Sequence, residues 1–202
     1  MSTSSATDIC DALAHDALAV VPGFLPAKAI AALAGEARLR DAAGEFRAAA
    51  VGRGSSRAAR SDIRGDRTHW LDERAPAIAE RSFWQAMRSL RVELNRTLYM
   101  GLCVFECHYA FYPVGGFYRR HRDQFRDRTS SGARALSCVL YLNDDWKEED
   151  GGALRVYCDG APRDVLPLGG TFVCFLSERF EHEVLPTTRE RLSVTGWFRR
   201  RV

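Results

Sequence analysis

Residues Gly116-Phe-Tyr-Arg-Arg-His-Arg-Asp123 alternate aromatic and polar side chains and predict a β-strand. In a strand, residues two positions apart point to the same face. His121 and Asp123 would then lie side by side, where an imidazole and a carboxylate can bind one ion. A His-x-Asp triplet is common by chance in a chain of this composition, so the surrounding sequence has to support the prediction.

A third candidate ligand lies further along the chain. Residues 170–177 (Gly-Thr-Phe-Val-Cys-Phe-Leu-Ser) predict another strand, and His182 follows just beyond its expected end. Two imidazoles and one carboxylate on one face of a metal leave three positions open, as in non-haem Fe(II) enzymes that bind a cosubstrate and O2 together. We therefore expect His121, Asp123 and His182 to bind Fe(II) and to support oxidative chemistry.

The last predicted strand, residues 189–199, supplies a polar face beside this site. Arg191, Ser193, Thr195 and Trp197 share one side of it, and apolar residues share the other, namely Leu192, Val194 and Phe198. The planar guanidinium of an arginine binds a carboxylate through two parallel hydrogen bonds. The strand therefore predicts a lined pocket in which Arg191 anchors a carboxylate.

The second half of the chain predicts a mainly β fold. Short strand patterns separated by Gly, Pro, Asn and Asp clusters occur at residues 103–112, 117–123, 134–143, 153–158, 171–176 and 191–199. This succession favours a jelly-roll β-sandwich, the double-stranded β-helix, with the metal at the open end between its sheets.

The first half predicts helices that pack on one outer sheet. Helices are expected at residues 5–15, 26–41 and 76–98, with strands at 17–24, 45–51 and 68–71. Residues 52–66 are rich in Gly, Ser and Arg and predict a mobile loop. We expect one domain over residues 1–202, with helical support over 1–44 and the jelly-roll core over about 45–202.

Composition excludes several classes of protein. The chain has 46% hydrophobic residues, a net charge of +3 and six cysteines, and we find neither a secretory signal nor an apolar stretch long enough to span a bilayer. We expect a cytoplasmic protein with reduced, buried thiols and no membrane partner. Cys103, Cys107 and His108 suggest zinc, but no second pair completes a tetrahedral site. Arginine clusters at 53–67 and 199–201 lack a nucleic-acid-binding motif, so nucleic acid is not an expected partner.

A wider set of residues resembles a known family. The set is Tyr112-Pro113, Gly116, Tyr118, Arg120, His121-Arg-Asp123, Arg134, Tyr141-Leu-Asn-Asp144, Trp146, Gly151-Gly-Ala-Leu-Arg155, His182-Glu-Val184 and Arg191. It resembles the 2-oxoglutarate- and Fe(II)-dependent prolyl hydroxylases. Ser61-Asp-Ile-Arg-Gly-Asp66, followed by Trp70, is similar to the oxygen-sensing subgroup and its bacterial relatives that modify elongation factor Tu. The resemblance covers roughly residues 45–199.

This resemblance implies roles for individual side chains. His121, Asp123 and His182 would bind iron, and Arg191 would pair with the far carboxylate of 2-oxoglutarate. Tyr141 would donate a hydrogen bond to that carboxylate, and Ser193 would assist or replace it. Thr195 and Trp197 would line the same pocket, and Tyr112 would lie near its metal end. Residues 52–66 would cover the substrate, with Arg64 in this loop and its base fastened by a pair between Asp66 and Arg134.

The resemblance also implies an activity, which is hydroxylation of a prolyl residue in a protein, coupled to decarboxylation of 2-oxoglutarate to succinate. Its cofactors would be Fe(II), 2-oxoglutarate and O2, with ascorbate in support, and elongation factor Tu is one candidate substrate. A free amino acid hydroxylase and a non-catalytic sensor of iron and 2-oxoglutarate remain alternatives. Nucleic-acid demethylases of similar chemistry carry a second arginine six residues after the anchor, where this chain has Trp197.

Overall fold

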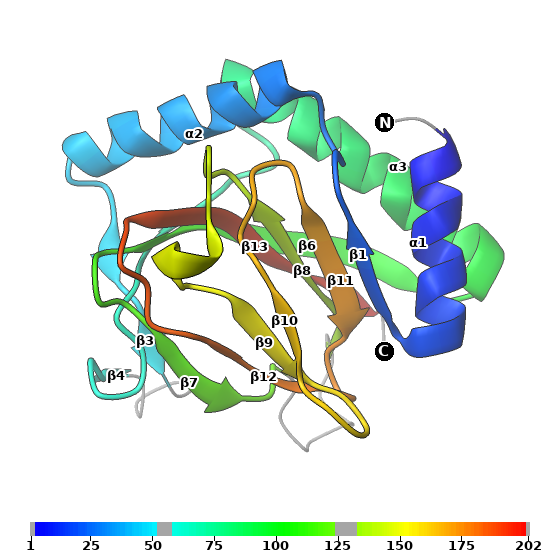
Figure 1. The fold of residues 1–202 in the computed structure, drawn as a ribbon. Coiled ribbons are helices and arrows are strands. Elements are labelled where there is room, and N and C mark those ends of the chain that lie inside the picture. The colour runs from blue at the N-terminus through cyan, green and yellow to red at the C-terminus, as the bar shows by residue number, and fades with distance from the viewer. Residues whose placement is uncertain (1–2, 52–57, 124–132, 201–202) are drawn as a thin grey trace.

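The structure is a computed structural model that describes residues 3–51, 58–123 and 133–200. Two antiparallel sheets face each other, and the helices lie against the outer face of the larger sheet (Figure 1). The predicted mainly β, jelly-roll architecture with helices on one sheet is confirmed.

The larger sheet has seven strands in the order β1-β11-β8-β13-β6-β5-β2. These are β1 (Leu18–Val21), β2 (Arg47–Ala48), β5 (Arg67–Trp70), β6 (Leu102–Tyr112), β8 (Arg134–Tyr141), β11 (Phe172–Leu176) and β13 (Arg191–Arg200). Strand β13 lies in the middle and pairs with β6 on one side and β8 on the other. Its apolar residues Leu192, Val194 and Phe198 join the core under the helices, so its other face is turned towards the smaller sheet, as predicted.

The smaller sheet has four strands in the order β10-β9-β12-β7. These are β7 (Tyr118–His121), β9 (Leu154–Tyr157), β10 (Arg163–Val165) and β12 (Glu181–Val184). A separate hairpin pairs β3 (Ala50–Val51) with β4 (Ala58–Ala59). Apolar side chains from both sheets form a second core between them, with Leu154, Val156 and Val184 from the smaller sheet.

Three helices cover the larger sheet, and short 3-10 turns connect other elements. The helices are α1 (Thr3–Asp16), α2 (Ala27–Ala42) and α3 (Arg81–Leu98), and the 3-10 turns are η2 (Ile78–Glu80) and η3 (Glu148–Asp150). Helix α3 buries a stripe of Phe83, Met87, Leu90 and Leu94, which are spaced three to four residues apart as one helical face requires. Pro26 lies at the N-cap of α2, directly before its first turn.

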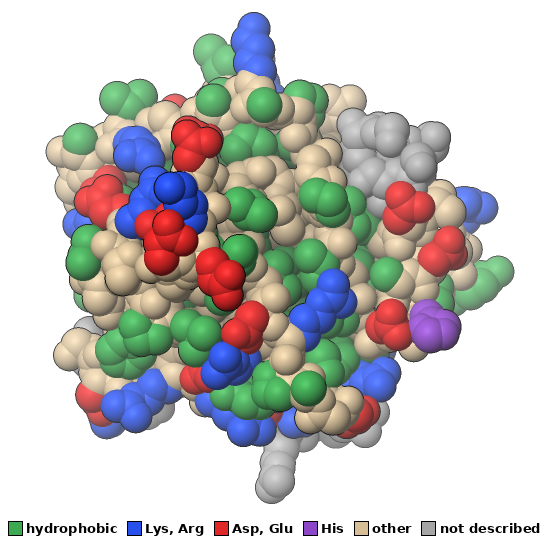
Figure 2. All heavy atoms as spheres, in the orientation of Figure 1, with side chains coloured by type: hydrophobic (Ala, Val, Ile, Leu, Met, Phe, Trp, Pro, Cys, Tyr) green, Lys and Arg blue, Asp and Glu red, His purple; other side chains and the backbone are tan. Residues whose placement is uncertain are grey.

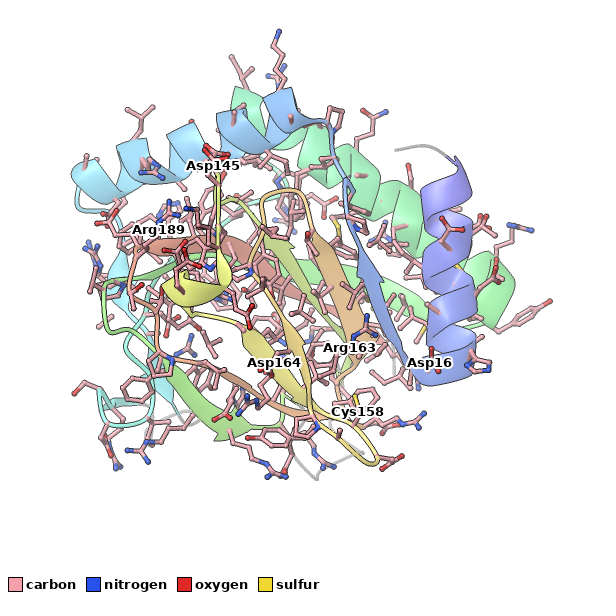
Figure 3. The ribbon with its side chains drawn as sticks, viewed as in Figure 1. Asp16, Asp145, Cys158, Arg163, Asp164 and Arg189 are labelled. Carbon is pink, nitrogen blue, oxygen red and sulfur yellow. The ribbon has the colours of Figure 1, made fainter. Side chains whose placement is uncertain are left out.

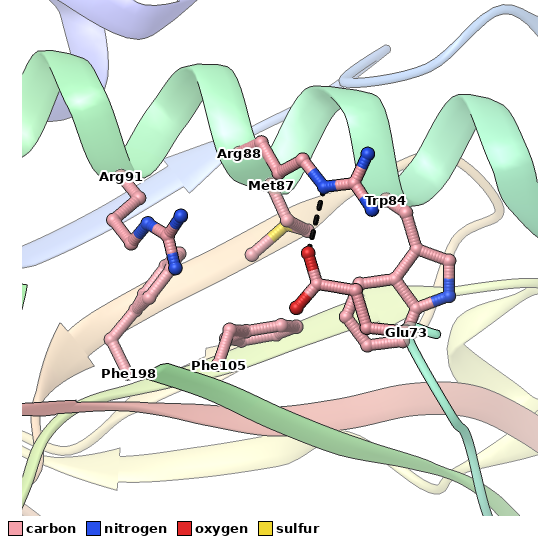
Figure 4. A pocket seen from close by; sticks show the side chains of 7 residues that line it. All are labelled: Glu73, Trp84, Met87, Arg88, Arg91, Phe105 and Phe198. Carbon is pink, nitrogen blue, oxygen red and sulfur yellow. Dashed lines mark hydrogen bonds and ion pairs between the residues drawn. The ribbon is translucent and has the colours of Figure 1, made fainter. Parts of the chain in front are cut away.

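A small pocket lies where α3 crosses β6 and β13 (Figure 4). Its lining residues are Glu73, Trp84, Met87, Arg88, Arg91, Phe105 and Phe198. Arg88 donates from Nε to Glu73 Oε1 at 2.7 Å at its mouth. Phe105 and Phe198 belong to the core under the helices, so this pocket opens on the side of the sheet opposite the predicted metal site.

Two strands in the second half of the chain, β10 and β12, were not predicted. His182 lies beyond the end of β11, as expected, and is itself part of β12. Both unpredicted strands are short, and their outward side chains are charged, as in the pair between Arg155 on β9 and Asp164 on β10 at 2.8 Å. Such strands lack the apolar run by which a strand is recognised in sequence.

The predicted loop at 52–66 is only partly described, because residues 52–57 lie outside the described ranges. Residues 58 and 59 form β4, and Gly65 donates from its backbone N to the Phe117 carbonyl at 2.9 Å. The C-terminal part of this segment is therefore fixed against β7.

Charged side chains of both signs lie next to one another on the face shown in Figure 2. One group surrounds η3, where Arg189 pairs with Asp150 at 2.9 Å and donates to the carbonyl of Asp145 at 3.1 Å (Figure 3). Across the described ranges, we find no helix with both the length and the apolar character needed to cross a membrane.

Candidate metal and cosubstrate site

The predicted metal ligands converge at one end of the space between the sheets. His121 ends β7 and lies directly across from His182 on β12, while Asp123 follows β7 by two residues. Asp123 Oδ1 is 3.6 Å from His121 Nε2, and Asp123 Oδ2 is 3.5 Å from His182 Nε2. One ligand atom from each residue lies within 4.8 Å of the other two, and among the described residues they form the one group of this kind.

Backbone carbonyls fix which nitrogen each imidazole presents. His121 Nδ1 lies 2.7 Å from the Arg119 carbonyl, and His182 Nδ1 lies 3.5 Å from the Phe180 carbonyl. A carbonyl can only accept, so each Nδ1 carries the hydrogen and Nε2 keeps a lone pair for a metal. Burial lowers the pKa of His182 to about 4, more than the Asp123 carboxylate raises it, so this ring is neutral at physiological pH.

The Asp123 carboxylate is held by two donors. Ser137 Oγ and Trp197 Nε1 both donate to its Oδ2, at 2.7 Å and 2.8 Å. Burial alone would raise the pKa of Asp123, but His182, His121 and Ser137 outweigh it and hold this pKa below its ordinary value. Two imidazoles with free Nε2 atoms and one ionised, oriented carboxylate suit Fe(II).

Trp197 therefore contacts a metal ligand, whereas the sequence predicted it as pocket lining. Ser137 was not predicted at all. A signal existed, because Ser137 and Tyr141 are four positions apart on β8 and share its inward face.

Arg191 is the second feature of the site. It is 2% exposed, and its Nε donates to the Gly152 carbonyl at 2.8 Å. No carboxylate lies within ion-pairing distance of it in the part of the chain that the structure describes. A buried guanidinium without a counter-charge is costly unless a ligand supplies one.

Two tyrosines flank this guanidinium. The Arg191 Cζ lies 5.0 Å from the ring centre of Tyr112 and 5.1 Å from that of Tyr141. The Tyr141 hydroxyl is buried next to the Arg191 guanidinium, which can only donate, so the proton of this hydroxyl has no acceptor among the described residues. Burial raises the pKa of Tyr141 to about 12 despite the opposing charge of Arg191, so the hydroxyl remains a donor. Arg191 and Tyr141 thus present donors side by side in the place where the family resemblance predicts that a carboxylate binds.

Gly152 makes room for the anchor. Its φ is +65°, and a Cβ at this position would lie 3.1 Å from Arg191 Cδ and from the Thr187 side chain. Glycine is suited to this position both by its conformation and by the close approach of Arg191.

Ser193 and Thr195 extend the inward face of β13. Ser193 is fully buried and lies across from Tyr141 on β8, and its hydroxyl is 3.4 Å from that of Thr195. Thr195 lies across from His108 on β6. Both predicted positions therefore lie on the strand face that carries Arg191 and Trp197.

His108 is a site residue that the sequence did not predict. Its ring packs against Trp70 and Trp197, with ring-centre distances of 4.8 Å and 5.5 Å, and its buried Nδ1 has no hydrogen-bond partner among described residues. Burial, with the charges of Arg64 and Arg134, lowers the pKa of His108 to about 3. Its neighbour Cys107 joins the core under the helices, so the two side chains point to opposite faces and cannot share a zinc ion.

The predicted pair between Asp66 and Arg134 was wrong. Asp66 accepts two hydrogen bonds from Arg64, at 2.7 Å and 2.6 Å. Arg134 lies 3.5 Å above the Trp197 ring and donates to Glu106 at 3.2 Å. Arg64 and Asp66 are two residues apart, so their side chains point to the same side of the chain and can pair without a partner from a distant segment.

All six cysteines are free, as predicted. Cys10, Cys107, Cys138 and Cys174 are buried, and Cys103 and Cys158 are half-buried. None of them takes part in the metal site.

Comparisons with known proteins agree with this geometry. Residues 107–199 match the model of the 2OG-Fe(II) oxygenase superfamily. The chain is 45% identical to a Pseudomonas putida prolyl-4-hydroxylase of known structure, with a TM-score of 0.85, over 98% of this chain and 100% of that one.

Two further similarities are more distant. A prolyl hydroxylase from Trichoplax adhaerens, solved with a peptide of the hypoxia-inducible factor oxygen degradation domain, has the same fold, with a TM-score of 0.83 and 24% identity over 96% of this chain and 88% of that one. Human Egl nine homolog 1 is 29% identical over 147 residues, which are 68% of this chain and 33% of that protein. The chain thus spans about a third of this curated relative.

Proposed function

Because the chain belongs to the prolyl hydroxylases of the 2OG-Fe(II) oxygenase superfamily, we propose that it hydroxylates a prolyl residue of a protein substrate. Fe(II), 2-oxoglutarate and O2 are the cofactors of this family. The reaction would convert 2-oxoglutarate to succinate and CO2.

The buried, uncompensated Arg191 carries this proposal. Its guanidinium has no carboxylate partner among the described residues, and the proton of the Tyr141 hydroxyl beside it has no acceptor there. Both groups lie on strands that also hold the metal ligand Asp123, through Trp197 on β13 and Ser137 on β8. A dicarboxylate bound at the metal by one end and at Arg191 by the other would satisfy all these groups at once.

The residues of the site have separate tasks in this reaction. When bound, Fe(II) and 2-oxoglutarate supply the activation of O2 and the oxidation of the substrate C–H bond. His121 and His182 offer Nε2 lone pairs, and Asp123 offers an ionised oxygen whose direction is set by its two donors. Arg191 and Tyr141 orient the cosubstrate, and this pre-organised orientation lowers the entropic cost of reaction.

The substrate class is the finer part of the proposal. The Pseudomonas putida protein, 45% identical to this chain, is a prolyl-4-hydroxylase, and the Trichoplax adhaerens prolyl hydroxylase of the same fold was solved with a protein-derived peptide. We propose a protein substrate on this basis, with elongation factor Tu as the candidate that residues 61–66 and Trp70 suggested.

Mass spectrometry tests this function directly. Anaerobic Fe(II)-loaded protein is mixed with 2-oxoglutarate and purified elongation factor Tu, and O2 is then admitted. We expect a gain of one oxygen on a proline of the substrate, together with an equal amount of succinate, and the Arg191→Gln variant should produce neither. Oxygen gain on another protein would replace elongation factor Tu as substrate, whereas oxygen gain on free proline alone, or binding without succinate, would reject protein hydroxylation.

A further inference from the structure

A buried ion pair lies close to the metal site. Arg64 donates from Nε to Asp66 Oδ1 at 2.7 Å and from a terminal nitrogen to Asp66 Oδ2 at 2.6 Å. The Arg64 side chain is 14% exposed and that of Asp66 is 0% exposed. Two parallel bonds to one buried carboxylate fix both the position and the plane of the guanidinium.

The guanidinium is the first member of a stacked column. Its Cζ lies 4.3 Å from the ring centre of Tyr118. The Tyr118 ring lies against the ring of His121, with centres 3.6 Å apart and planes inclined by 17°. Arg64, Tyr118 and His121 therefore form a column that ends on a metal ligand.

His121 needs this support more than His182 does. Its strand β7 is at the edge of the smaller sheet, whereas β12, which carries His182, is flanked by β9 and β7. The side chain of His121 is 18% exposed, against 7% for His182. The hydrogen bond to the Arg119 carbonyl fixes the direction of Nδ1, and the flat contact with Tyr118 fixes the plane of the ring.

The backbone joins the same two segments. Ile63 accepts at its carbonyl from Arg119 N at 2.8 Å, and Gly65 N donates to the Phe117 carbonyl at 2.9 Å. Arg64 and Tyr118 face each other between these bonds as an isolated antiparallel bridge. The segment that carries Arg64 thus covers the outer edge of β7, and a change at Arg64 is transmitted directly to the strand of His121.

We propose that Arg64 is a positioning residue for the metal ligand His121, acting through the Tyr118 ring and held in place by Asp66. The sequence assigned Arg64 and Asp66 to substrate covering, so retention of the metal is an additional role. The inference rests on the proposed metal site but needs neither substrate nor turnover. Failure to hydroxylate any protein would reject the proposed function and leave this inference standing.

Metal affinity measured without cosubstrate tests the proposal. Co(II) is titrated anaerobically into the metal-free protein in competition with a fluorescent chelator. Tyr118→Leu removes the ring, and the double variant Arg64→Met, Asp66→Asn removes the guanidinium without leaving a buried carboxylate unpaired. We expect each to bind Co(II) about tenfold more weakly than the wild type, within the range for residues that support metal ligands.

The chain offers matched controls. Tyr118→Phe keeps the ring and should keep Co(II) affinity. Arg60 and Asp62 form a pair of the same geometry, with distances of 2.8 Å and 2.7 Å, but both side chains are more than half exposed. The double variant Arg60→Met, Asp62→Asn should therefore bind Co(II) like the wild type.

Thermal unfolding of each metal-free variant separates positioning from loss of fold. If the column variants are folded and bind Co(II) as tightly as the wild type, the proposal is overturned. Equal losses in the column variants and in the Arg60 and Asp62 control would also overturn it. Should the double variant fail to fold, Arg64→Lys keeps the charge opposite Asp66 but loses the flat contact, and weaker Co(II) binding is expected there too.

Discussion

Replacing Tyr141 by phenylalanine removes one hydroxyl, which the structure places in an unusual position. The hydroxyl is fully buried beside Arg191, and its proton has no acceptor among the described residues. In the ligand-free protein such a group costs about 1–3 kcal/mol because it has left water without compensation. Its removal should leave the free energy of unfolding unchanged or raise it by about 1 kcal/mol, which is roughly 2–4 °C in Tm for a chain of this size.

Cosubstrate binding should respond in the opposite direction. A hydrogen bond to a charged group contributes about 1.5–3 kcal/mol. At about 1.4 kcal/mol per factor of ten, Tyr141→Phe should raise the Kd of 2-oxoglutarate by about 10- to 100-fold. Because burial raises the pKa of Tyr141 to about 12, the hydroxyl stays a donor and the effect should be constant between pH 6 and pH 9.

Calorimetry measures both quantities. Scanning calorimetry of the metal-free protein gives stability, and titration of 2-oxoglutarate into the Mn(II)-loaded protein under anaerobic conditions gives Kd. Tyr109→Phe is the control, because its hydroxyl is also buried but belongs to the core under the helices, where it is close to Glu80 and not to Arg191. A Tyr141→Phe protein that is less stable when metal-free and binds 2-oxoglutarate normally would refute the assignment of this pocket.

Three further predictions concern the same site. Arg191→Lys keeps a cation but loses the planar pair of donors, so 2-oxoglutarate titrated into the Mn(II)-loaded protein should bind at least about tenfold more weakly. Unchanged affinity would show that Arg191 does not bind the carboxylate of 2-oxoglutarate. Trp197→Phe removes the donor 2.8 Å from Asp123, so a Co(II) titration should show about tenfold weaker binding at unchanged fold; equal affinity would mean that Ser137 alone orients the carboxylate. Burial lowers the pKa of His108 to about 3, so between about pH 6.5 and 3 the unfolded chain binds a proton that the folded chain does not. The free energy of unfolding should therefore fall as pH falls, by on the order of 3 kcal/mol at pH 4. Urea unfolding between pH 7 and 4 should show that this free energy depends less on pH in His108→Phe than in the wild type, and an equal pH dependence would contradict the burial argument.

The anchor could be predicted because it depends on strand alternation, by which Arg191 shares a face of β13 with Trp197. His121 and Asp123 could be predicted from their close spacing, although β7 ends at His121 and Asp123 lies two residues beyond it. His182 could be predicted from its place after the strand that is β11.

The residues that support the ligands depend on which strands are neighbours, and this was not evident from sequence. Ser137 lies across from Trp197 because β8 pairs with β13, and the two side chains together hold Asp123. His108 lies among aromatic rings because β6 is placed between β5 and β13. For Asp66, the family resemblance indicated a distant partner, whereas Arg64 two residues away forms the pair.

One unbroken central strand, β13, carries Arg191 near its start and Trp197 six residues later, about 20 Å along an extended chain. The spacing between the cosubstrate anchor and the support of the metal carboxylate is therefore set by peptide geometry, with β6 and β8 holding the strand on both sides. Substitutions in the core under the helices should reduce the yield of folded protein without changing which length of diacid is accepted. Inserting or deleting a single residue between Arg191 and Trp197 would change the spacing between them and turn the side chain of one of them towards the helices.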